Sequence, residues 1–192
     1  MKLILASASP RRRELLKMIA PEFEIATGVD VDETYPASMP AEQVPEYLSR
    51  LKARGYQSWV RTSDEVLITA DTIVIIDGEI LGKPAGRDEA IAMLERLSGC
   101  AHTVITGVTL TTLSGGMESF SQTTTVYFDE ISREDIVHYV DTYQPYDKAG
   151  AYGIQEWIGA AAIRGIKGSF YNVMGLPVHK LFEHLRAIER QR

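Results

Sequence analysis

The sequence predicts an α/β fold with some α+β character, in which helices flank a mixed central sheet. Segments with strand and helix periodicity alternate along the chain, which is typical of helices packed on a sheet. Two long, alternating, threonine-rich runs at 103–113 and 119–128 are joined across Ser114-Gly115-Gly116 and predict an antiparallel hairpin exposed on one face. A hairpin among interspersed helices indicates a mixed sheet.

The first elements are defined by short local signals. Residues 2–6 (KLILA) form an apolar run that predicts a buried strand. Ser9-Pro10 then predicts a helix start, because serine caps a helix and proline suits its first position. Leu15, Met18 and Ile19 give this helix an apolar face, and residues 23–26 predict a further short strand.

The middle and the end of the chain continue the alternation. A helix is expected from about Pro45, a strand at 66–70 that runs on to 76, a hairpin turn at Asp77-Gly78, and a helix over 90–97 that ends at Gly99. Ser132 and Asp135 resemble a capping box and predict a helix through Tyr143. The spacing of apolar residues at 178–185 predicts the last helix, including Phe182 on its apolar face.

Length and composition limit the architecture. The chain has 192 residues, little more than one domain of about 150, so we expect a single domain over 1–192, pinched into two lobes. A hydrophobic fraction of 45% and a charged fraction of 24% are typical of a soluble globular protein. These values exclude disorder, collagen and coiled coil.

Charge narrows the classes of partner. Against 26 acidic residues there are 20 Lys and Arg, a net charge of −6, so the chain as a whole is a poor binder of nucleic-acid backbone. One cysteine, Cys100, permits no internal disulfide, which suits a cytoplasmic protein. The apolar stretch at 3–6 is too short for a signal-peptide core or a membrane span, so we expect no membrane association.

The first 13 residues carry a local excess of positive charge. Ser7, Ser9, Arg11 and Arg12 lie between a predicted strand and a predicted helix, followed by a third arginine, with no acidic residue among them. Helix N-terminal amides, hydroxyls and guanidinium groups together suit a phosphate chain. The alternative interpretation is an ordinary capped helix with solvated arginines.

Asp71 is the second candidate, because it directly follows five largely apolar strand residues. A carboxylate placed there can bind Mg²⁺ or accept a proton from water, whereas the alternative is a turn former at the end of a strand. Glu33 in an acidic segment and Lys83 in Gly82-Lys83-Pro84 supply further carboxylate and positive charge. Mg²⁺ chemistry on a phosphate chain needs both kinds of group.

A third segment, 148–155, combines glycines with Tyr152 and Gln155. Glycines allow close approach of a backbone, and an amide can pair with a nucleobase edge. Tyr152 could stack on a base or pack in the core. The P-loop, the Rossmann fingerprint and zinc-ligand spacings are absent from the sequence.

Five blocks in order resemble the Maf family. They run from Leu5 to Pro177, nearly the whole chain, and are 5–16 (LASASPRRRELL), 70–74 (ADTIV), 82–84 (GKP), 147–155 (DKAGAYGIQ) and 168–177 (GSFYNVMGLP). The resemblance implies a two-lobed fold of the inosine-triphosphatase type with the nucleotide in a cleft. It implies a nucleoside triphosphate pyrophosphatase, in the branch that hydrolyses dTTP and UTP to the monophosphate and pyrophosphate.

The resemblance also implies roles for individual residues. It makes Asp71 the proton acceptor, associates Ser7, Glu33 and Lys83 with phosphate and metal, and makes Arg12, Thr72 and Gln155 determinants of base choice. We expect a divalent cation, Mg²⁺ or Mn²⁺, at Glu33 and Asp71. The expected partner is a small nucleoside triphosphate, with no nucleic acid polymer, and the family also implies a homodimer.

One departure from the family pattern affects the phosphate contacts. The family usually reads Arg-Leu-Ala-x-x-Lys-Ala after the acidic loop, whereas here residues 50–56 read RLKARGY, which puts Gly55 at the expected lysine. Either Lys52 or Arg54 then supplies the missing charge, or the contact is weaker. This departure, with the family's association with septum formation, leaves a non-catalytic nucleotide sensor that regulates cell division as the alternative function.

Overall fold

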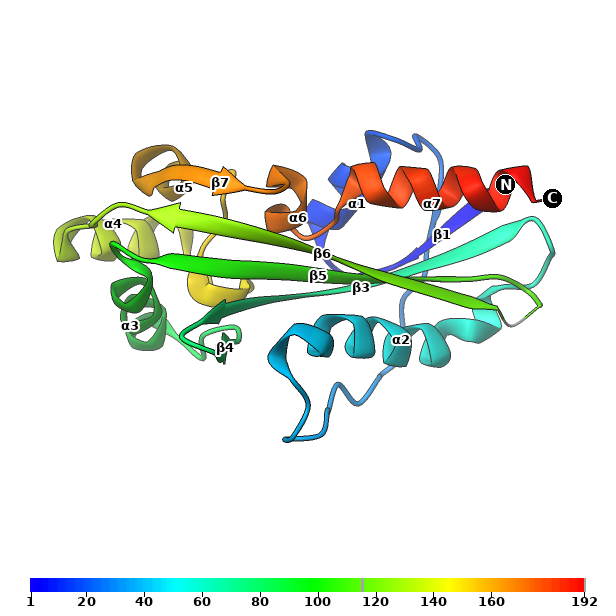
Figure 1. Cartoon of the computed structure of the whole chain (residues 1–192), viewed down its shortest axis with the longest axis horizontal. Helices are drawn as coiled ribbons and strands as arrows, with labels where there is room; N and C mark the ends of the chain where they lie inside the picture. The colour runs from blue at the N-terminus through cyan, green and yellow to red at the C-terminus, as the bar shows by residue number, and fades with distance from the viewer. Residues whose placement is uncertain (115, 192) are drawn as a thin grey trace. The chain divides into compact units, whose positions relative to one another are not determined.

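The computed structural model describes residues 1–114 and 116–191 and separates into two compact units (Figure 1). The first unit comprises Met1–Asp71, Thr106–Gln122 and Gly175–Arg192, and the second comprises Thr72–Ile105 and Thr123–Met174. Each unit is therefore assembled from separate stretches of sequence. In the described residues, no helix is long and apolar enough to cross a membrane.

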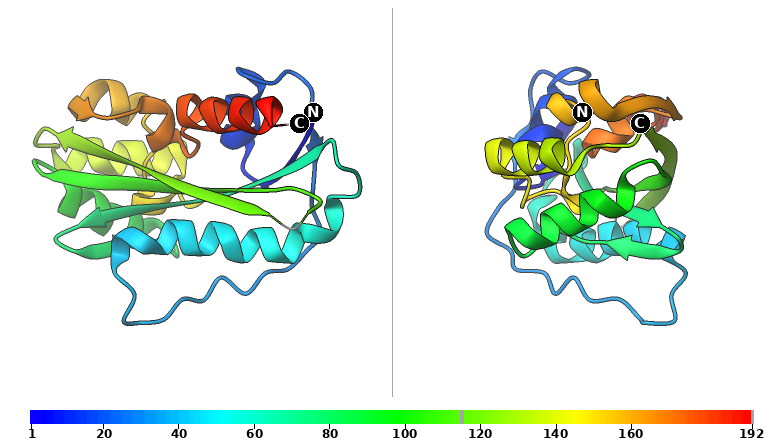
Figure 2. Two further views of the ribbon diagram at one scale, coloured as in Figure 1. Left: turned by 45° about the vertical axis from the view of Figure 1, so that its right-hand side comes forward. Right: turned by 90° about the vertical axis from the view of Figure 1, so that its left-hand side faces the viewer.

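The first unit begins with β1 (Lys2–Ala6), α1 (Pro10–Lys17) and β2 (Glu24–Ile25). A long loop without helix or strand then runs beside α2 (Figure 2) and leads into it. The remaining elements that lie within this unit are η1 (Ala41–Gln43), α2 (Val44–Tyr56), η2 (Gln57–Trp59) and α7 (Val178–Arg190). In β1, Ile4 and Leu5 pair in parallel with β2, and all five residues pair in parallel with β3 (Glu65–Ile76).

The second unit holds the hairpin of β3 with β4 (Glu79–Leu81), in which Asp77 and Gly78 both have positive φ, as the sequence predicted. The other elements that lie within this unit are α3 (Arg87–Leu97), α4 (Arg133–Tyr143), η3 (Ala149–Ala151), α5 (Trp157–Ala162), β7 (Ile163–Lys167) and α6 (Phe170–Met174). Ser132 caps α4 by accepting the Asp135 N–H at 3.1 Å, which confirms the predicted helix start, and its hydroxyl donates to Oδ2 of Asp135 at 2.7 Å.

The strand order confirms a mixed sheet. Among the described residues it is β2-β1-β3-β5-β6-β7, with β4 paired to β3 and with β5 and β6 spanning Ala101–Thr111 and Met117–Phe128. β3 pairs antiparallel with β4, and β6 pairs antiparallel with β7. The boundaries between the units fall inside β3, β5 and β6, so these strands contribute to both units.

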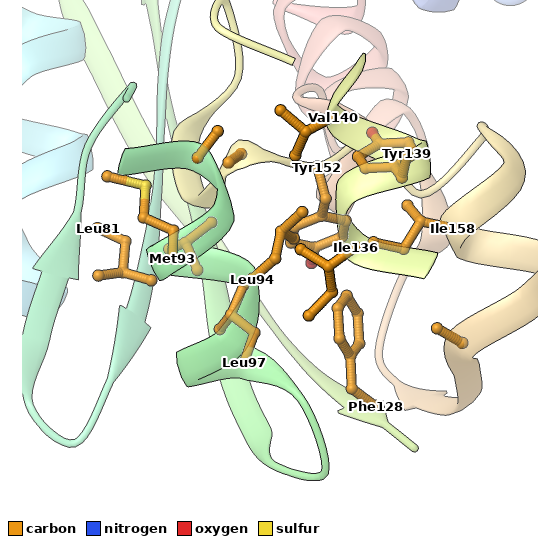
Figure 3. Packing of buried hydrophobic residues seen from close by; sticks show 14 of the residues in the cluster. Leu81, Met93, Leu94, Leu97, Phe128, Ile136, Tyr139, Val140, Tyr152 and Ile158 are labelled. Carbon is orange, nitrogen blue, oxygen red and sulfur yellow. The ribbon is translucent and has the colours of Figure 1, made fainter. Parts of the chain in front are cut away.

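Each unit has a buried apolar cluster. The cluster of the second unit joins α3, α4 and the segment around Tyr152, and Figure 3 shows its side chains interlocking. A smaller cluster in the first unit contains Ile4, Ala6, Ala26, Val60 and Leu67. The predicted strands at 2–6 and 66–70 supply the members on β1 and β3, which confirms that both are buried strands.

Several expectations about single residues were wrong. Asp71 is not the turn former that was its alternative interpretation, because β3 continues through it for five more residues. The first arm of the hairpin is not half-exposed: nearly every residue of β5 is buried, and α2 packs against this strand at Gly107 and Thr109. Met18 follows the end of α1 and is exposed, as is Phe182 on α7. The turn predicted at 114–116 includes Gly115, which is outside the described residues.

Candidate active site

The connection from β1 to α1 holds the predicted phosphate segment. Ser9 is the N-cap of α1, and its Oγ accepts the Arg12 N–H at 3.5 Å, with Pro10 at the first helical position. Ser7 is buried, and its Oγ accepts the Ser9 N–H at 3.2 Å. The predicted helix start is therefore present, and its first turn has no acidic residue to compete with an anion.

Arg12 is held against the strand that carries Asp71. Its Nε donates to the Gly175 carbonyl at 2.8 Å, and a terminal nitrogen donates to the Ala70 carbonyl at 2.9 Å. Burial lowers the pKa of Arg12, while the Asp71 charge raises it and the Arg11 charge lowers it. The two carbonyls set the direction of a guanidinium group that remains charged at any physiological pH.

Two predicted metal ligands meet at one cationic nitrogen. The ammonium of Lys52 on α2 lies 2.7 Å from Oδ1 of Asp71 and 2.9 Å from Oε2 of Glu33. The Lys52 and Asp71 side chains are only 14% and 13% exposed, whereas Glu33 is 52% exposed. A buried carboxylate and an accessible one are therefore brought together from β3 and from the loop before α2.

Of the two cations considered as replacements for the family lysine, Lys52 is the one that reaches the site. Arg54 is exposed. Gly55 serves packing instead, because a Cβ there would lie 2.7 Å from Cγ2 of Val31 in the acidic loop. A side chain at position 55 would require the Val31 methyl group to move, so Gly55 allows the acidic loop to pack closely against α2.

A network of hydroxyl groups, which sequence reasoning missed, fixes α2 on the sheet. Thr69 Oγ1 donates to the Ser49 carbonyl at 2.8 Å, and Ser49 Oγ lies 2.8 Å from Thr109 Oγ1. Lys52 follows Ser49 by one helical turn, and Asp71 follows Thr69 by two residues on the same face of β3. The network therefore positions both partners of the Lys52–Asp71 pair.

The donor set fits a divalent cation. Carboxylate oxygens are the ligands that Mg²⁺ prefers, and Mg²⁺ is usually bound by one or two carboxylates together with substrate phosphates and water. Glu33 and Asp71 already converge on a positive charge, that of Lys52. The described residues contain no group of three or more His, Cys, Asp or Glu side chains arranged around a metal position, so phosphate and water would complete the coordination.

The remaining predicted residues lie in the second unit. Thr72 follows Asp71 on β3, and successive strand residues face opposite sides of a sheet. Lys83 is exposed on the turn after β4, and Gln155 is exposed between η3 and α5. The Gly150 N–H donates to the Gly82 carbonyl at 3.0 Å, which joins the lysine turn to the segment that leads to Gln155.

Tyr152 packs in the core and does not form an exposed stacking surface. It is 5% exposed, and its hydroxyl lies 2.7 Å from Nε2 of His102. The rings of Tyr152, His102 and Phe128 meet edge to face. Of the two interpretations of this residue, the structure supports packing.

The structure thus groups the predicted site residues by unit. The first unit contains Ser7, Arg11, Arg12, Glu33 and Asp71, and the second contains Thr72, Lys83 and Gln155. Lys52 is the functional candidate that the sequence left undecided. No local signal could single it out, because its partners lie 19 residues away on both sides along the chain.

Comparison with known proteins shows the family to which the chain is similar. The sequence profile described as Maf-like protein matches residues 2–188. A Bacteroides thetaiotaomicron protein named dTTP/UTP pyrophosphatase is 52% identical over 187 residues, covering 97% of this chain and 96% of the relative. Relatives with the same name from Porphyromonas gingivalis W83 and Flavobacterium johnsoniae are 52% and 41% identical, covering 96% and 97% of this chain and 93% and 95% of theirs.

A solved structure shares the fold. The Staphylococcus aureus Ham1 protein aligns with a TM-score of 0.56 at 14% identity, covering 97% of this chain and 99% of that one. The similarity supports the inosine-triphosphatase type of fold that the sequence predicted. Because the family profile spans almost the whole sequence and the Bacteroides thetaiotaomicron and Porphyromonas gingivalis relatives are about half identical over more than nine-tenths of their length, the chain belongs to the Maf family.

Proposed function

We propose that this protein hydrolyses dTTP and UTP to the nucleoside monophosphate and pyrophosphate. The observation that carries the proposal is the buried Asp71 carboxylate held by Lys52, on the same unit as the basic start of α1. The names of the relatives, which share about half of their residues with this chain, support the substrate assignment.

In the proposed reaction, Asp71 accepts a proton from a water molecule. The water oxygen forms a bond to the α phosphorus, and the bond from that phosphorus to the bridging oxygen breaks, so pyrophosphate leaves with the electron pair. Oδ1 of Asp71 accepts a hydrogen bond from Lys52, so we assign the proton transfer to Oδ2. A fixed carboxylate orientation is what a general base requires.

Positive charge on the first unit would offset the charge of the triphosphate. We assign Ser7, Arg11 and Arg12, on and before α1, to phosphate binding. Lys83 in the second unit is also assigned to phosphate. A divalent cation at Glu33 and Asp71 would supply Lewis-acid polarisation of the phosphate oxygens. Lys52, which contacts both carboxylates, adds a positive charge beside the place that we assign to the phosphate chain.

Base choice is proposed to involve Arg12, Thr72 and Gln155. An amide offers one donor and one acceptor, which suits the paired imide N–H and carbonyl of thymine and uracil. A site that hydrogen-bonds this edge rejects a base with a different pattern, because its own polar groups would be left unpaired. Gln155 is exposed, as a base-reading side chain must be before the nucleotide binds.

The remaining expectations stay predictions. We propose one pyrophosphatase domain over 1–192, because neither unit is a continuous stretch of sequence that could be separated from the other. A homodimer, a cytoplasmic location and the lack of nucleic acid binding complete the proposal. The net charge of −6 supports the last of these.

Pyrophosphate release from a panel of canonical nucleoside triphosphates with Mg²⁺ tests the proposal. We expect turnover of dTTP and UTP by the wild type, at least about 100-fold less by Asp71→Asn, and normal turnover by the exposed control Asp64→Asn. Tight binding without turnover would instead support the sensor. Full activity of Asp71→Asn would contradict the assigned base.

A further inference from the structure

A buried polar cluster in the second unit lies next to the Gln155 segment. We call it the Tyr139 cluster and define it as Tyr139, Glu156 and Lys148. Tyr139 on α4 is fully buried, and its hydroxyl donates to Oε2 of Glu156 and accepts the Gly153 N–H at 3.0 Å. Figure 3 shows Tyr139 within the apolar cluster that surrounds it.

Lys148 completes the charge balance of the cluster. Its ammonium lies 3.1 Å from Oε1 of Glu156 and 2.8 Å from Oδ1 of Asp147, and the Lys148 and Glu156 side chains are 9% and 18% exposed. An ion pair this buried contributes little net stability, because desolvation of both charges offsets their attraction. Fixing the geometry of the adjacent chain is the role that the contacts suggest.

The cluster holds the chain on both sides of Gln155. The Glu156 N–H donates to the Gly153 carbonyl at 3.0 Å and closes a tight turn over residues 153–156. Tyr139 binds the backbone of Gly153 at the start of this turn and the side chain of Glu156 at its end. Gln155 is therefore carried by a turn whose two ends share one hydroxyl group.

Gly153 permits this geometry. A Cβ at this position would lie 2.8 Å from Cδ of Glu156 and 2.9 Å from Nε2 of Gln155. Both side chains therefore fold back over the glycine backbone, and the direction of the Gln155 amide depends on how that backbone is held. Burial and the Glu156 hydrogen bond raise the pKa of Tyr139, so its hydroxyl keeps the proton that it donates.

We propose that Tyr139 is a positioning residue for base selection, which it performs by fixing the 153–156 turn and thereby the amide of Gln155. The inference rests on the proposed function, in which Gln155 pairs with the base. It locates part of the specificity in a side chain that does not touch the nucleotide. Loss of the hydroxyl would loosen the amide, and the difference in binding between thymine and cytosine would shrink.

The test compares two deletions of the same atom. Tyr139→Phe and Tyr152→Phe each remove one hydroxyl from a buried tyrosine of the same core, but the Tyr152 hydroxyl contacts His102 and not the turn. We would measure the dissociation constants of dTMP and dCMP, kcat and KM for dTTP and dCTP, and the urea midpoint of unfolding. Gln155→Ala serves as the reference for complete loss of amide recognition.

We expect Tyr139→Phe to reduce the preference for thymine over cytosine by about 10-fold, in binding and in kcat/KM, with kcat for dTTP within about 3-fold of wild type. Tyr152→Phe should lower the urea midpoint and leave the preference unchanged. Glu156→Gln, which keeps an acceptor for the tyrosine hydroxyl but loses the Lys148 charge pair, should give an intermediate preference and remains informative if Tyr139→Phe does not fold.

An unchanged thymine preference in Tyr139→Phe, or equal changes in both tyrosine variants, would overturn the positioning role. If Tyr139→Phe does not fold, the positioning role would be overturned by a thymine preference in Glu156→Gln that equals that of the wild type. Failure of the proposed function has a different signature, namely no pyrophosphate release by the wild type. The dTMP and dCMP affinities do not require turnover, so they decide the role of Tyr139 in either case.

Discussion

Lys52 and Asp71 form a largely buried ion pair, with the ammonium nitrogen 2.7 Å from Oδ1 of the carboxylate. The same nitrogen lies 2.9 Å from Glu33, so one lysine joins the acidic loop, α2 and β3. The contact fixes the orientation of the carboxylate that we propose as the general base, and Lys52 places a positive charge where the proposed triphosphate and metal would bind. Its effect on activity can be measured directly.

Lys52→Met should lower turnover of dTTP at least about 100-fold, because it removes charge stabilisation from the reacting phosphates. The matched control is Lys2→Met, which removes a lysine paired with Asp64 at 3.7 Å on the surface, where the lysine side chain is 71% exposed. The control should retain wild-type kcat. Steady-state kinetics gives kcat for dTTP in the two variants. Normal turnover by Lys52→Met would show that this lysine has no role in the reaction.

Thr69→Val should destabilise the fold by about 1 kcal/mol, because it removes the buried hydroxyl that donates to Ser49. We also expect kcat to fall about 3- to 10-fold, since α2 carries Lys52. Thr111→Val is the matched control: Thr111 is equally buried, and its hydroxyl has no hydrogen-bond partner within residues 1–114 and 116–191. The control should have a urea midpoint of unfolding and a kcat close to those of the wild type. Equal losses of stability and kcat in both variants would contradict the network.

Gly107→Ala tests how closely α2 approaches β5. A Cβ there would lie 2.3 Å from the Glu46 nitrogen and 2.4 Å from the Pro45 carbonyl, and backbone atoms cannot move aside as a flexible side chain can. We expect Gly107→Ala to lower the free energy of unfolding by about 3 kcal/mol or more. Gly165→Ala on β7, where a Cβ meets nothing within 4 Å, should be neutral or slightly stabilising. Urea midpoints that do not separate the two variants would refute the close approach.

His102 makes stability depend on pH. Burial lowers the pKa of His102 to about 4, and its Nδ1 has no hydrogen-bond partner in the described part of the chain. In the unfolded chain the ordinary pKa is about 6.5, so between pH 6.5 and 4 the unfolded state binds the additional proton. The free energy of unfolding therefore falls as the pH is lowered through this window.

Because of His102, the free energy of unfolding should be about 2 kcal/mol smaller at pH 4.5 than at pH 7. Urea unfolding at both pH values checks it in the wild type and in His102→Gln, which should lack this part of the pH dependence. His179→Gln replaces a histidine whose side chain is 84% exposed and should follow the wild type. The same pH dependence in His102→Gln would mean that other groups cause it.

How far the sequence predicted the structure depends on the range of each signal. Ser9-Pro10, Asp77-Gly78 and Ser132 act on neighbouring residues, and each element that they predicted is present. The burial of β5 could not be predicted from its threonine-rich alternation, because the hydroxyls of Thr106, Thr109 and Thr111 are buried. The elements that pack on each face of the sheet, and not the local pattern, decide which face of such a strand is exposed.

The same reasoning applies to the site. Residue type and local context single out Asp71 and the basic start of α1 as candidates, and the family resemblance adds the role of Glu33. Lys52 was left as one of two alternatives, since only the packing of α2 against β3 brings it to Asp71. The contact of Tyr139 with the Gln155 turn depends on the position of α4, which no motif in the sequence encodes.

Hydrolysis of dTTP in ¹⁸O-labelled water tests the central claim most directly. Attack of water on the α phosphorus predicts one labelled oxygen in dTMP and none in pyrophosphate, at a rate that falls at least about 100-fold in Asp71→Asn. Label in pyrophosphate, release of orthophosphate, or an undiminished rate in Asp71→Asn would contradict it.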